Sequence, residues 1–157
     1  MSDKNIQVNF NLANPIQFLA LGFGSGLARK APGTFGTLAA VPLFLLMSGL
    51  TPLVYGLLVL AVCISGIYIC GKAASDVGVH DHGAIVWDEF AGFFITMFMV
   101  PVSWQSVLVG FILFRIFDIA KPWPISIADK KLTGGFGIMF DDVLAGLFAL
   151  VIMHLIF

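Results

Sequence analysis

The sequence predicts an all-α integral membrane protein, a compact bundle of about five transmembrane helices with an N-terminal interfacial segment. Three observations support this prediction. Apolar residues make up 59% of the 157 residues, and the mean hydropathy is +1.01. Only 11% of the residues are charged, less than half of the usual share in a soluble domain. The apolar residues also fall in runs close to the length that a helix needs to cross a bilayer.

Five apolar runs are expected to form the membrane helices: 35–50, 52–71, 84–100, 104–121 and 138–157. The first run is short for a full span and is either a short span or re-entrant. The fourth run is followed by Pro122 and Pro124, which end a helix because proline blocks its continuation.

The remaining segments are short connections. Residues 15–27 are apolar but too short to span, so we expect an interfacial or re-entrant segment there. Loops are expected at 28–34, which contains a Pro-Gly turn, and at 72–83. An amphipathic surface stretch at 125–133 and a glycine-rich turn at 134–137 precede the last helix. With no internal repeat or linker, residues 1–157 are expected to form a single membrane-embedded domain.

The charged residues indicate how the bundle is oriented. The connections between the first and second helices and between the third and fourth carry no charge. Five spans therefore place every charged segment on one side, and the positive-inside rule makes that side cytoplasmic. The formal net charge is −1, and no basic block suggests a nucleic-acid partner.

Charged residues on three of these helices share one depth in the bilayer: Asp88, Glu89, Arg115, Asp118, Lys121, Asp141 and Asp142. At about 1.5 Å per residue, the acids lie roughly 20 to 24 Å from the outer ends of their helices. An ionisable residue in a span costs about 2.5–3.5 kcal/mol and usually faces a polar cavity. The sequence therefore predicts one shared site near the inner headgroups.

Each of these charges also has a simpler structural explanation. Arg115 and Asp118 are i,i+3 neighbours that could neutralise each other, and Lys121 could extend to the surface. Asp141 and Asp142 are expected in the first turn of a helix, where the helix dipole favours acids. The gathering of all seven residues at one depth favours the shared site.

Five carboxylates beside two cations suit a phosphorylated lipid of the inner leaflet. Carboxylate oxygens favour a hard cation such as Mg²⁺, which also binds substrate phosphates. Arg115 and Lys121 would bind a phosphate beside the metal. Adjacent acids on a helix point about 100° apart, so each of the two acidic pairs is expected to give one ligand and one supporting group.

Two glycine-rich stretches also suit a phosphate. In 22–37, the expected phosphate-binding residues are Gly24, Ser25, Lys30 and Thr34. In 134–142, the expected helix N-terminus offers free N–H groups to an anion. Glycines also allow close helix packing, which is the structural alternative. His80 and His82 flank Asp81, where we expect a solvated loop or hinge rather than a metal site.

Four motifs carry a family resemblance: "GFGSGL…APGTFGTLAA", "VHDHGAIVWDEFAGF", "FRIFDIAKPWPI" and "GGFGIMFDDVLAGL". In this order and spacing, the chain resembles the phosphatidylglycerophosphatase A family from about residue 15 to 150. The resemblance implies a multi-pass enzyme of the bacterial inner membrane, with its active site facing the cytoplasm. That enzyme would release phosphate from phosphatidylglycerophosphate, giving phosphatidylglycerol, and would require Mg²⁺. One departure is Arg29, where family members often carry proline, so no specific role is assigned to Arg29.

The family's acidic motifs fall here on the residues predicted to be catalytic and metal-binding: Asp88, Glu89, Asp118, Asp141 and Asp142. In the predicted mechanism, they hold one or two Mg²⁺ ions, with Glu89 as ligand or base, while water attacks the phosphorus. A covalent phospho-aspartate is the alternative route. An ion-coupled transporter and a non-catalytic membrane subunit are the alternative functions. The oligomeric state is left open.

Overall fold

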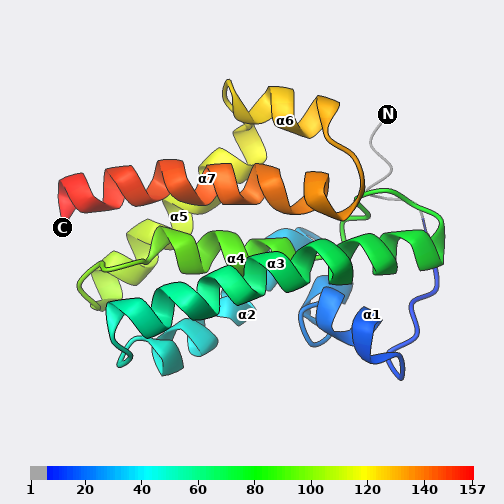
Figure 1. Ribbon diagram of the computed structural model, residues 1–157, viewed down its shortest axis with the longest axis horizontal. Helices are drawn as coiled ribbons and strands as arrows, with labels where there is room; N and C mark the ends of the chain where they lie inside the picture. The colour runs from blue at the N-terminus through cyan, green and yellow to red at the C-terminus, as the bar shows by residue number, and fades with distance from the viewer. Residues whose placement is uncertain (1–6) are drawn as a thin grey trace.

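The structure is a computed structural model that describes residues 7–157, and this part of the chain is entirely helical (Figure 1). The elements in chain order are α1 (Pro15–Ala20), the 3₁₀ turn η2 (Ser25–Leu27), α2 (Pro32–Met47), α3 (Pro52–Val77), α4 (Trp87–Thr96), α5 (Trp104–Ala120), α6 (Ile125–Lys131) and α7 (Gly134–Ile156). The predicted all-α class is therefore confirmed.

The longer helices form a bundle with two distinct ends. In Figure 1, α3, α4 and α7 run side by side, while α6 lies over α7 and α1 packs near the end of α3. One end carries the α2–α3 and α4–α5 connections together with the C-terminus. The opposite end carries α1, the start of α2, the α3–α4 loop and the start of α7. All charged residues among those described, from Arg29 to Asp142, lie toward this second end, which we call the polar end.

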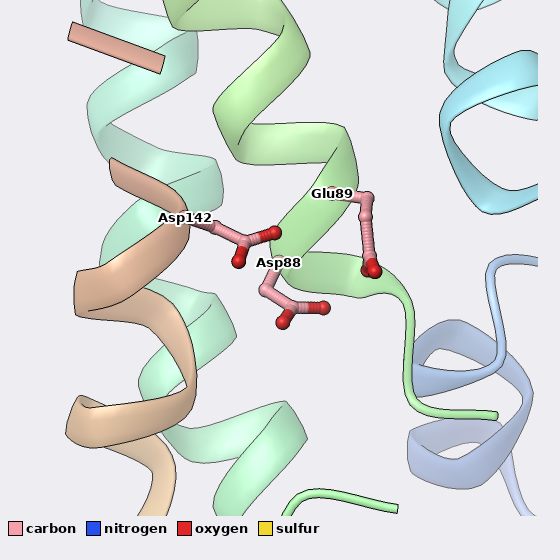
Figure 2. A group of neighbouring side chains, drawn as sticks. All are labelled: Asp88, Glu89 and Asp142. Atoms are coloured by element: carbon pink, nitrogen blue, oxygen red, sulfur yellow. The ribbon is translucent and has the colours of Figure 1, made fainter. Parts of the chain in front are cut away.

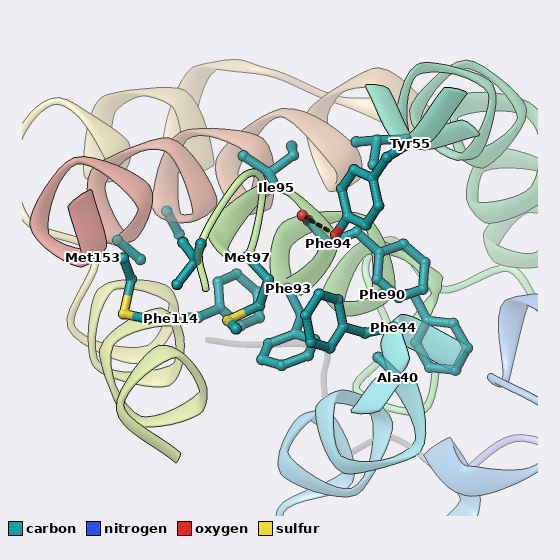
Figure 3. Packing of buried hydrophobic residues seen from close by; sticks show 14 of the residues in the cluster. Ala40, Phe44, Tyr55, Phe90, Phe93, Phe94, Ile95, Met97, Phe114 and Met153 are labelled. Carbon is teal, nitrogen blue, oxygen red and sulfur yellow. Dashed lines mark hydrogen bonds between the residues drawn. The ribbon is translucent and has the colours of Figure 1, made fainter. Parts of the chain in front are cut away.

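The short helix α4 lies at the centre of the core. Every residue from Asp88 to Thr96 is buried, because α2, α3, α5 and α7 all pack against α4. Figure 3 shows the aromatic cluster around it, where the Tyr55 hydroxyl of α3 donates a hydrogen bond of 2.6 Å to the Phe94 carbonyl oxygen. The polar first turn of α4 is thus buried as part of a central helix.

Two predicted helix boundaries were wrong by several residues. Helix α2 begins at Pro32 rather than at residue 35, because proline fits the first helical position, where no N–H donor is needed. Helix α3 continues to Val77, through half of the loop predicted at 72–83. Ala73 and Ala74 are buried there, and Gly78 ends the helix in the left-handed conformation.

The third predicted helix, 84–100, is also shorter in the structure. Residues 84–86 precede α4, and the Val86 N–H donates a 2.8 Å hydrogen bond to the Ala20 carbonyl. After Thr96 the chain turns, and Met99 has a positive φ of 56°. The ten residues of α4 rise only about 15 Å, which is half of the hydrocarbon thickness of a bilayer.

The turn predicted at 134–137 was wrong, because these residues form the first turn of α7. Gly135 allows this turn to contact α3, since a Cβ atom there would lie 1.7 Å from the Ile67 carbonyl oxygen. Asp141 and Asp142 consequently lie two turns inside the helix, and the predicted first-turn position for them is wrong. A side chain within the helix body can face neighbouring helices, whereas the helix dipole acts mainly at the first turn.

Two helices, Pro52–Val77 and Gly134–Ile156, are long and apolar enough to cross a membrane. Helix α2 is apolar but has only 16 residues, and α5 has 17 residues that include Arg115 and Asp118. The expected number of about five full spans is therefore not confirmed. Helices α5 and α6 follow the predicted ranges closely, and neither α1 nor η2 is long enough to span, as expected for 15–27.

Candidate metal and phosphate site

A cavity of about 340 Å³ opens at the polar end of the bundle, beside the first turn of α4. Its walls come from the start of α2, the α3–α4 loop, α4, the end of α5 and α7. The lining residues are Ala31, Pro32, Gly33, Asp81, His82, Gly83, Ile85, Asp88, Glu89, Arg115, Asp118, Ile119, Lys121, Asp141 and Asp142. The structure therefore brings together all five predicted carboxylates and both predicted cations.

Three of the carboxylates form a compact group. Figure 2 shows Asp142 reaching from α7 toward the first turn of α4, where it meets Asp88 and Glu89. One oxygen from each residue lies within 4.8 Å of the others, and all three side chains are buried. Three like charges so close together in a buried place repel one another unless a cation or protons neutralise them.

These carboxylates also have unused hydrogen-bonding capacity. Within residues 7–157, no hydrogen-bond partner reaches the buried atoms Asp88 Oδ1, Glu89 Oε2 and Asp142 Oδ2. A buried polar atom without a partner is costly, and native proteins rarely keep one without a bound water, ion or ligand. A hard divalent cation accepts oxygen ligands of this kind, so the donor set fits Mg²⁺.

Arg115 connects two of the acidic helices. It pairs with Asp118 one turn along α5, and its Nη1 atom lies 3.7 Å from Oε1 of Glu89 on α4. The Nε atom of Arg115 is buried and has no hydrogen-bond partner among the described residues. The guanidinium group therefore keeps a free donor near the cavity, as a site for a phosphate oxygen requires.

Lys121 connects α5 to α7. It ends α5 in the left-handed conformation, with a φ of 46°, and its Nζ atom lies 2.5 Å from Oδ2 of Asp141. Asp118 and Asp129 also lie within 3.7 Å of this ammonium group. Three carboxylates thus surround the ammonium group, and their negative charges favour its charged form.

Asp118 and Asp141 differ from the other three acids because both are held in ion pairs. Asp118 lies between Arg115 and Lys121, and Asp141 pairs with Lys121 and also accepts a 3.0 Å hydrogen bond from the Asp142 backbone N–H. In the described part of the chain, the group of possible metal ligands contains neither residue. The two pairs of adjacent acids therefore differ. Asp88 and Glu89 both belong to the group of possible metal ligands. In the second pair, only Asp142 belongs to it, and Asp141 forms an ion pair with Lys121.

The first turn of α2 closes the cavity on the side opposite α7. Gly33 is buried there, and a Cβ atom at this position would lie 2.6 Å from Glu89 Oε1 and 3.0 Å from Arg115 Nη2. Only a residue without a side chain lets α2 approach these two groups so closely. The first N–H groups of a helix have no partner within it, and they favour anions.

Four of the predicted phosphate-binding residues, Gly24, Ser25, Lys30 and Thr34, are not among the residues that line the cavity. The Ser25 hydroxyl donates a 2.7 Å hydrogen bond to the Gly22 carbonyl oxygen within its own turn. Lys30 is exposed. Lys30 and Thr34 directly flank the lining segment 31–33 in the sequence, so their role stays a prediction.

The sequence reasoning did not assign Asp81, His82 or Gly33 to the site. Asp81 has a φ of 49°, and the His82 Nδ1 atom accepts a 3.1 Å hydrogen bond from the Ala84 N–H. Both residues line the cavity, whereas His80 does not. Their motif, "VHDHG", was visible in the sequence, but its position beside the carboxylates depends on how the α3–α4 loop folds back.

Together, these features define a class of protein: an all-helical protein whose buried acidic cavity, edged by two cations, suits a divalent cation and a phosphate. The chain belongs to the phosphatidylglycerophosphatase A family, whose model matches residues 18–157.

Relatives named phosphatidylglycerophosphatase A match nearly the whole chain. The protein from Haemophilus influenzae is 49% identical over 158 aligned residues, which cover 99% of this chain and 97% of the relative. The protein from Escherichia coli K12 is 50% identical over 147 aligned residues, which cover 92% of this chain and 85% of the relative. A relative from Bacteroides thetaiotaomicron, 36% identical over 143 residues (86% and 89%), carries the provisional name of a phosphatidylinositol-3-phosphatase. No solved structure matches the chain.

Proposed function

We propose that this chain is a lipid phosphatase that hydrolyses phosphatidylglycerophosphate to phosphatidylglycerol and inorganic phosphate. Family membership and the names of the relatives from H. influenzae and E. coli support this substrate. One structural observation carries the proposal: three buried carboxylates, each with an oxygen that has no hydrogen-bond partner within residues 7–157, face the same cavity as Arg115 and Lys121. Cation ligands and phosphate ligands are thus available side by side.

Asp88, Glu89 and Asp142 would hold Mg²⁺ through their carboxylate oxygens. An all-oxygen donor set favours Mg²⁺, Ca²⁺ or Mn²⁺ over softer metals. When bound, the ion supplies Lewis-acid polarisation of the phosphoryl group and neutralises developing negative charge. The unpartnered oxygens of these residues support this assignment, and their mutual repulsion makes a cation favourable there.

Arg115 and Lys121 would bind the terminal phosphate. Charge-assisted hydrogen bonds from both cations to phosphate oxygens fix the phosphorus in the cavity. Asp118 contacts both cations and Asp141 contacts Lys121, so these two acids orient the phosphate-binding groups. The N-terminus of α2 at Gly33 adds a favourable dipole for an anion. The predicted contributions of Lys30, Thr34, Gly24 and Ser25 belong to this same proposal.

In the reaction, the oxygen of a water molecule forms a bond to phosphorus while the ester bond to the glycerol oxygen breaks. The departing glycerol oxygen takes up a proton and becomes the hydroxyl of phosphatidylglycerol. Glu89 Oε2, which is buried and has no hydrogen-bond partner in the described part of the chain, is available as a metal ligand or to accept the proton of the attacking water. A phospho-aspartate is the alternative, and the two routes differ in whether a phosphorylated aspartate can be trapped.

The proposal places the protein in the bacterial inner membrane as a single domain, with the polar end at the cytoplasmic face. Helix α3 leaves Leu53, Leu57, Leu60 and Ile64 more than half exposed, a large apolar surface that a lipid bilayer would cover. Helices α3 and α7 are long enough to cross the bilayer. Because every described Lys and Arg lies toward the polar end, the positive-inside rule supports the cytoplasmic orientation.

Release of inorganic phosphate from phosphatidylglycerophosphate by the purified protein in detergent tests the proposed function. We expect release with Mg²⁺ and none with excess EDTA, with activity restored when Mg²⁺ is added back. A folded protein that releases no phosphate under any of these conditions would favour the alternatives, a transporter or a non-catalytic subunit. Parallel assays with phosphatidylinositol 3-phosphate test the headgroup that the B. thetaiotaomicron relative's name suggests.

A further inference from the structure

A second, apolar groove lies between α2 and the N-terminal half of α5. Its volume is about 550 Å³, and apart from Ser103 its lining is apolar: Leu38, Val41 and Leu45 from α2, and Val102, Ser103, Trp104, Val107, Leu108 and Phe111 from α5 and the residues just before it. The two helices make only sparse contact with each other, which leaves this groove open. Leu38 and Leu108 are 54% and 50% exposed within it.

The groove and the polar cavity lie along the same two helices, one after the other. Gly33 of α2 and Arg115 of α5 line the cavity, and Leu38 and Phe111 line the near end of the groove. Five residues of helix separate Gly33 from Leu38, a rise of about 8 Å, and four separate Phe111 from Arg115, about 6 Å. The groove thus begins a short distance from the phosphate ligands, on the side that leads into the bundle's apolar zone.

The distance from the cavity ligands to the far end of the groove matches the depth of one leaflet. Its far end, at Leu45 and Trp104, lies about 17–18 Å along the helices from Gly33 and Arg115. Half of a bilayer's hydrocarbon core is about 15 Å thick. The interval between the cavity and the groove leaves room for the glycerol and phosphodiester that separate a terminal phosphate from the acyl chains.

We propose that this groove binds an acyl chain of the phospholipid whose terminal phosphate occupies the carboxylate cavity, so that the lipid reaches the site sideways between α2 and α5. The inference rests on the proposed function. The occupant is assigned from the position of the groove beyond the cavity on the same two helices, its apolar lining and its direction along the helices. Remote binding of this kind holds the reacting group in place, so it contributes to turnover as well as to affinity.

A bulky residue in the groove should make the enzyme discriminate against long acyl chains. The variant Leu38→Trp narrows the groove, and Leu60→Trp is the matched control, because Leu60 is also 54% exposed but lies on α3, outside the groove. Phosphate release is measured with dioleoyl and dihexanoyl phosphatidylglycerophosphate in mixed micelles. For Leu38→Trp we expect the ratio of kcat/KM for the long-chain lipid to that for the short-chain lipid to fall about tenfold, the effect of losing roughly two buried methylene contacts. Leu60→Trp should keep the wild-type ratio.

The outcomes separate this inference from the proposed function. If the wild-type protein hydrolyses both lipids and Leu38→Trp keeps the wild-type ratio, the enzyme function stands and the acyl-chain assignment is wrong. If the wild-type protein hydrolyses neither lipid, the proposed function fails and the assignment fails with it.

A second measurement on the unmodified protein covers the case in which Leu38→Trp does not fold. The probe is a phosphonate analogue of the long-chain lipid, which resists hydrolysis, with a photoreactive diazirine near the middle of one acyl chain. We expect cross-links to concentrate on peptides from α2 and α5 and to decrease with excess unlabelled lipid. Equal labelling of α2, α3, α5 and α7 without competition would overturn the proposal.

Discussion

Gly146 of α7 lies against the backbone of Gly92 of α4: a Cβ atom at Gly146 would lie 2.6 Å from the Gly92 carbonyl oxygen. Gly92 follows Asp88 by four residues, and Gly146 follows Asp142 by four residues. Residues four apart share a helix face, so the contact between the two glycines lies one turn from the two acids. This close approach of α4 and α7 therefore holds Asp88 near Asp142.

The variant Gly146→Ala should destabilise the protein. The new methyl group would meet rigid backbone, and overpacking of a core typically costs about 1–3 kcal/mol. The gain in helix propensity from Gly to Ala, at most about 1 kcal/mol, does not offset this. We expect a lower unfolding temperature in detergent and reduced phosphate release. The control is Gly56→Ala on α3, where the nearest atom is 3.6 Å away and only the propensity gain applies. Equal unfolding temperatures for the two variants would contradict the account.

The variant Gly33→Ala should affect activity much more than stability. Its methyl group would meet the ends of the Glu89 and Arg115 side chains, which can move, rather than backbone. We expect an unfolding temperature close to that of Gly56→Ala, but a decrease in kcat/KM of about ten- to a hundredfold, since displacing a catalytic group by about an ångström can cost that much. Steady-state kinetics and thermal unfolding on the same samples test this. Unchanged kinetics would show that the approach of α2 to Glu89 is unimportant for turnover.

Removal of the Lys121 charge should impair both phosphate binding and the position of Asp141. For Lys121→Met we expect kcat/KM to fall about ten- to a hundredfold, the range for losing a charged hydrogen-bond partner. Lys131→Met, on the exposed surface of α6, is the control. Lys121→Met should also lower the unfolding temperature, because it leaves the buried Asp141 carboxylate without its cation. Adding Asp141→Asn should recover most of this loss in unfolding temperature, because it removes that buried charge, but should not recover the activity. Restoration of activity by the double variant would mean that Lys121 serves only to neutralise Asp141.

The sequence was sufficient to predict that the charged residues of three helices gather, because burying charge in an apolar chain is costly enough to require a shared polar cavity. The seven charged residues predicted on these helices, from Asp88 to Asp142, line one cavity, whereas Gly24, Ser25, Lys30 and Thr34 do not and Asp81 was missed. The all-helical class and the positions of α5 and α6 were also predictable from the apolar runs and prolines. These features depend on local pattern and on the large energies of burial.

Other features depend on tertiary contacts that local pattern does not reveal. Helix α7 starts at Gly134, where Gly135 packs closely against the Ile67 carbonyl of α3. From the sequence alone, the same run of glycines is equally consistent with a turn. The short α4 depends on Val86 pairing with Ala20, far away in sequence. The packing of α4, α5 and α7 also decides which acids are possible metal ligands and which form ion pairs with Arg115 and Lys121.

The central claim is that Asp88, Glu89 and Asp142 together hold the divalent cation on which phosphate release depends. The most direct test is a Mg²⁺ titration of phosphate release by the wild-type protein and by Asp142→Asn. The control is Asp76→Asn, because Asp76 pairs with Lys72 on α3 and lies outside the cavity. We predict that Asp142→Asn raises the half-saturating Mg²⁺ concentration at least about tenfold, since a lost ligand costs at least as much as a lost supporting group. Asp76→Asn should match wild type. A folded Asp142→Asn protein with the wild-type Mg²⁺ curve would contradict the claim.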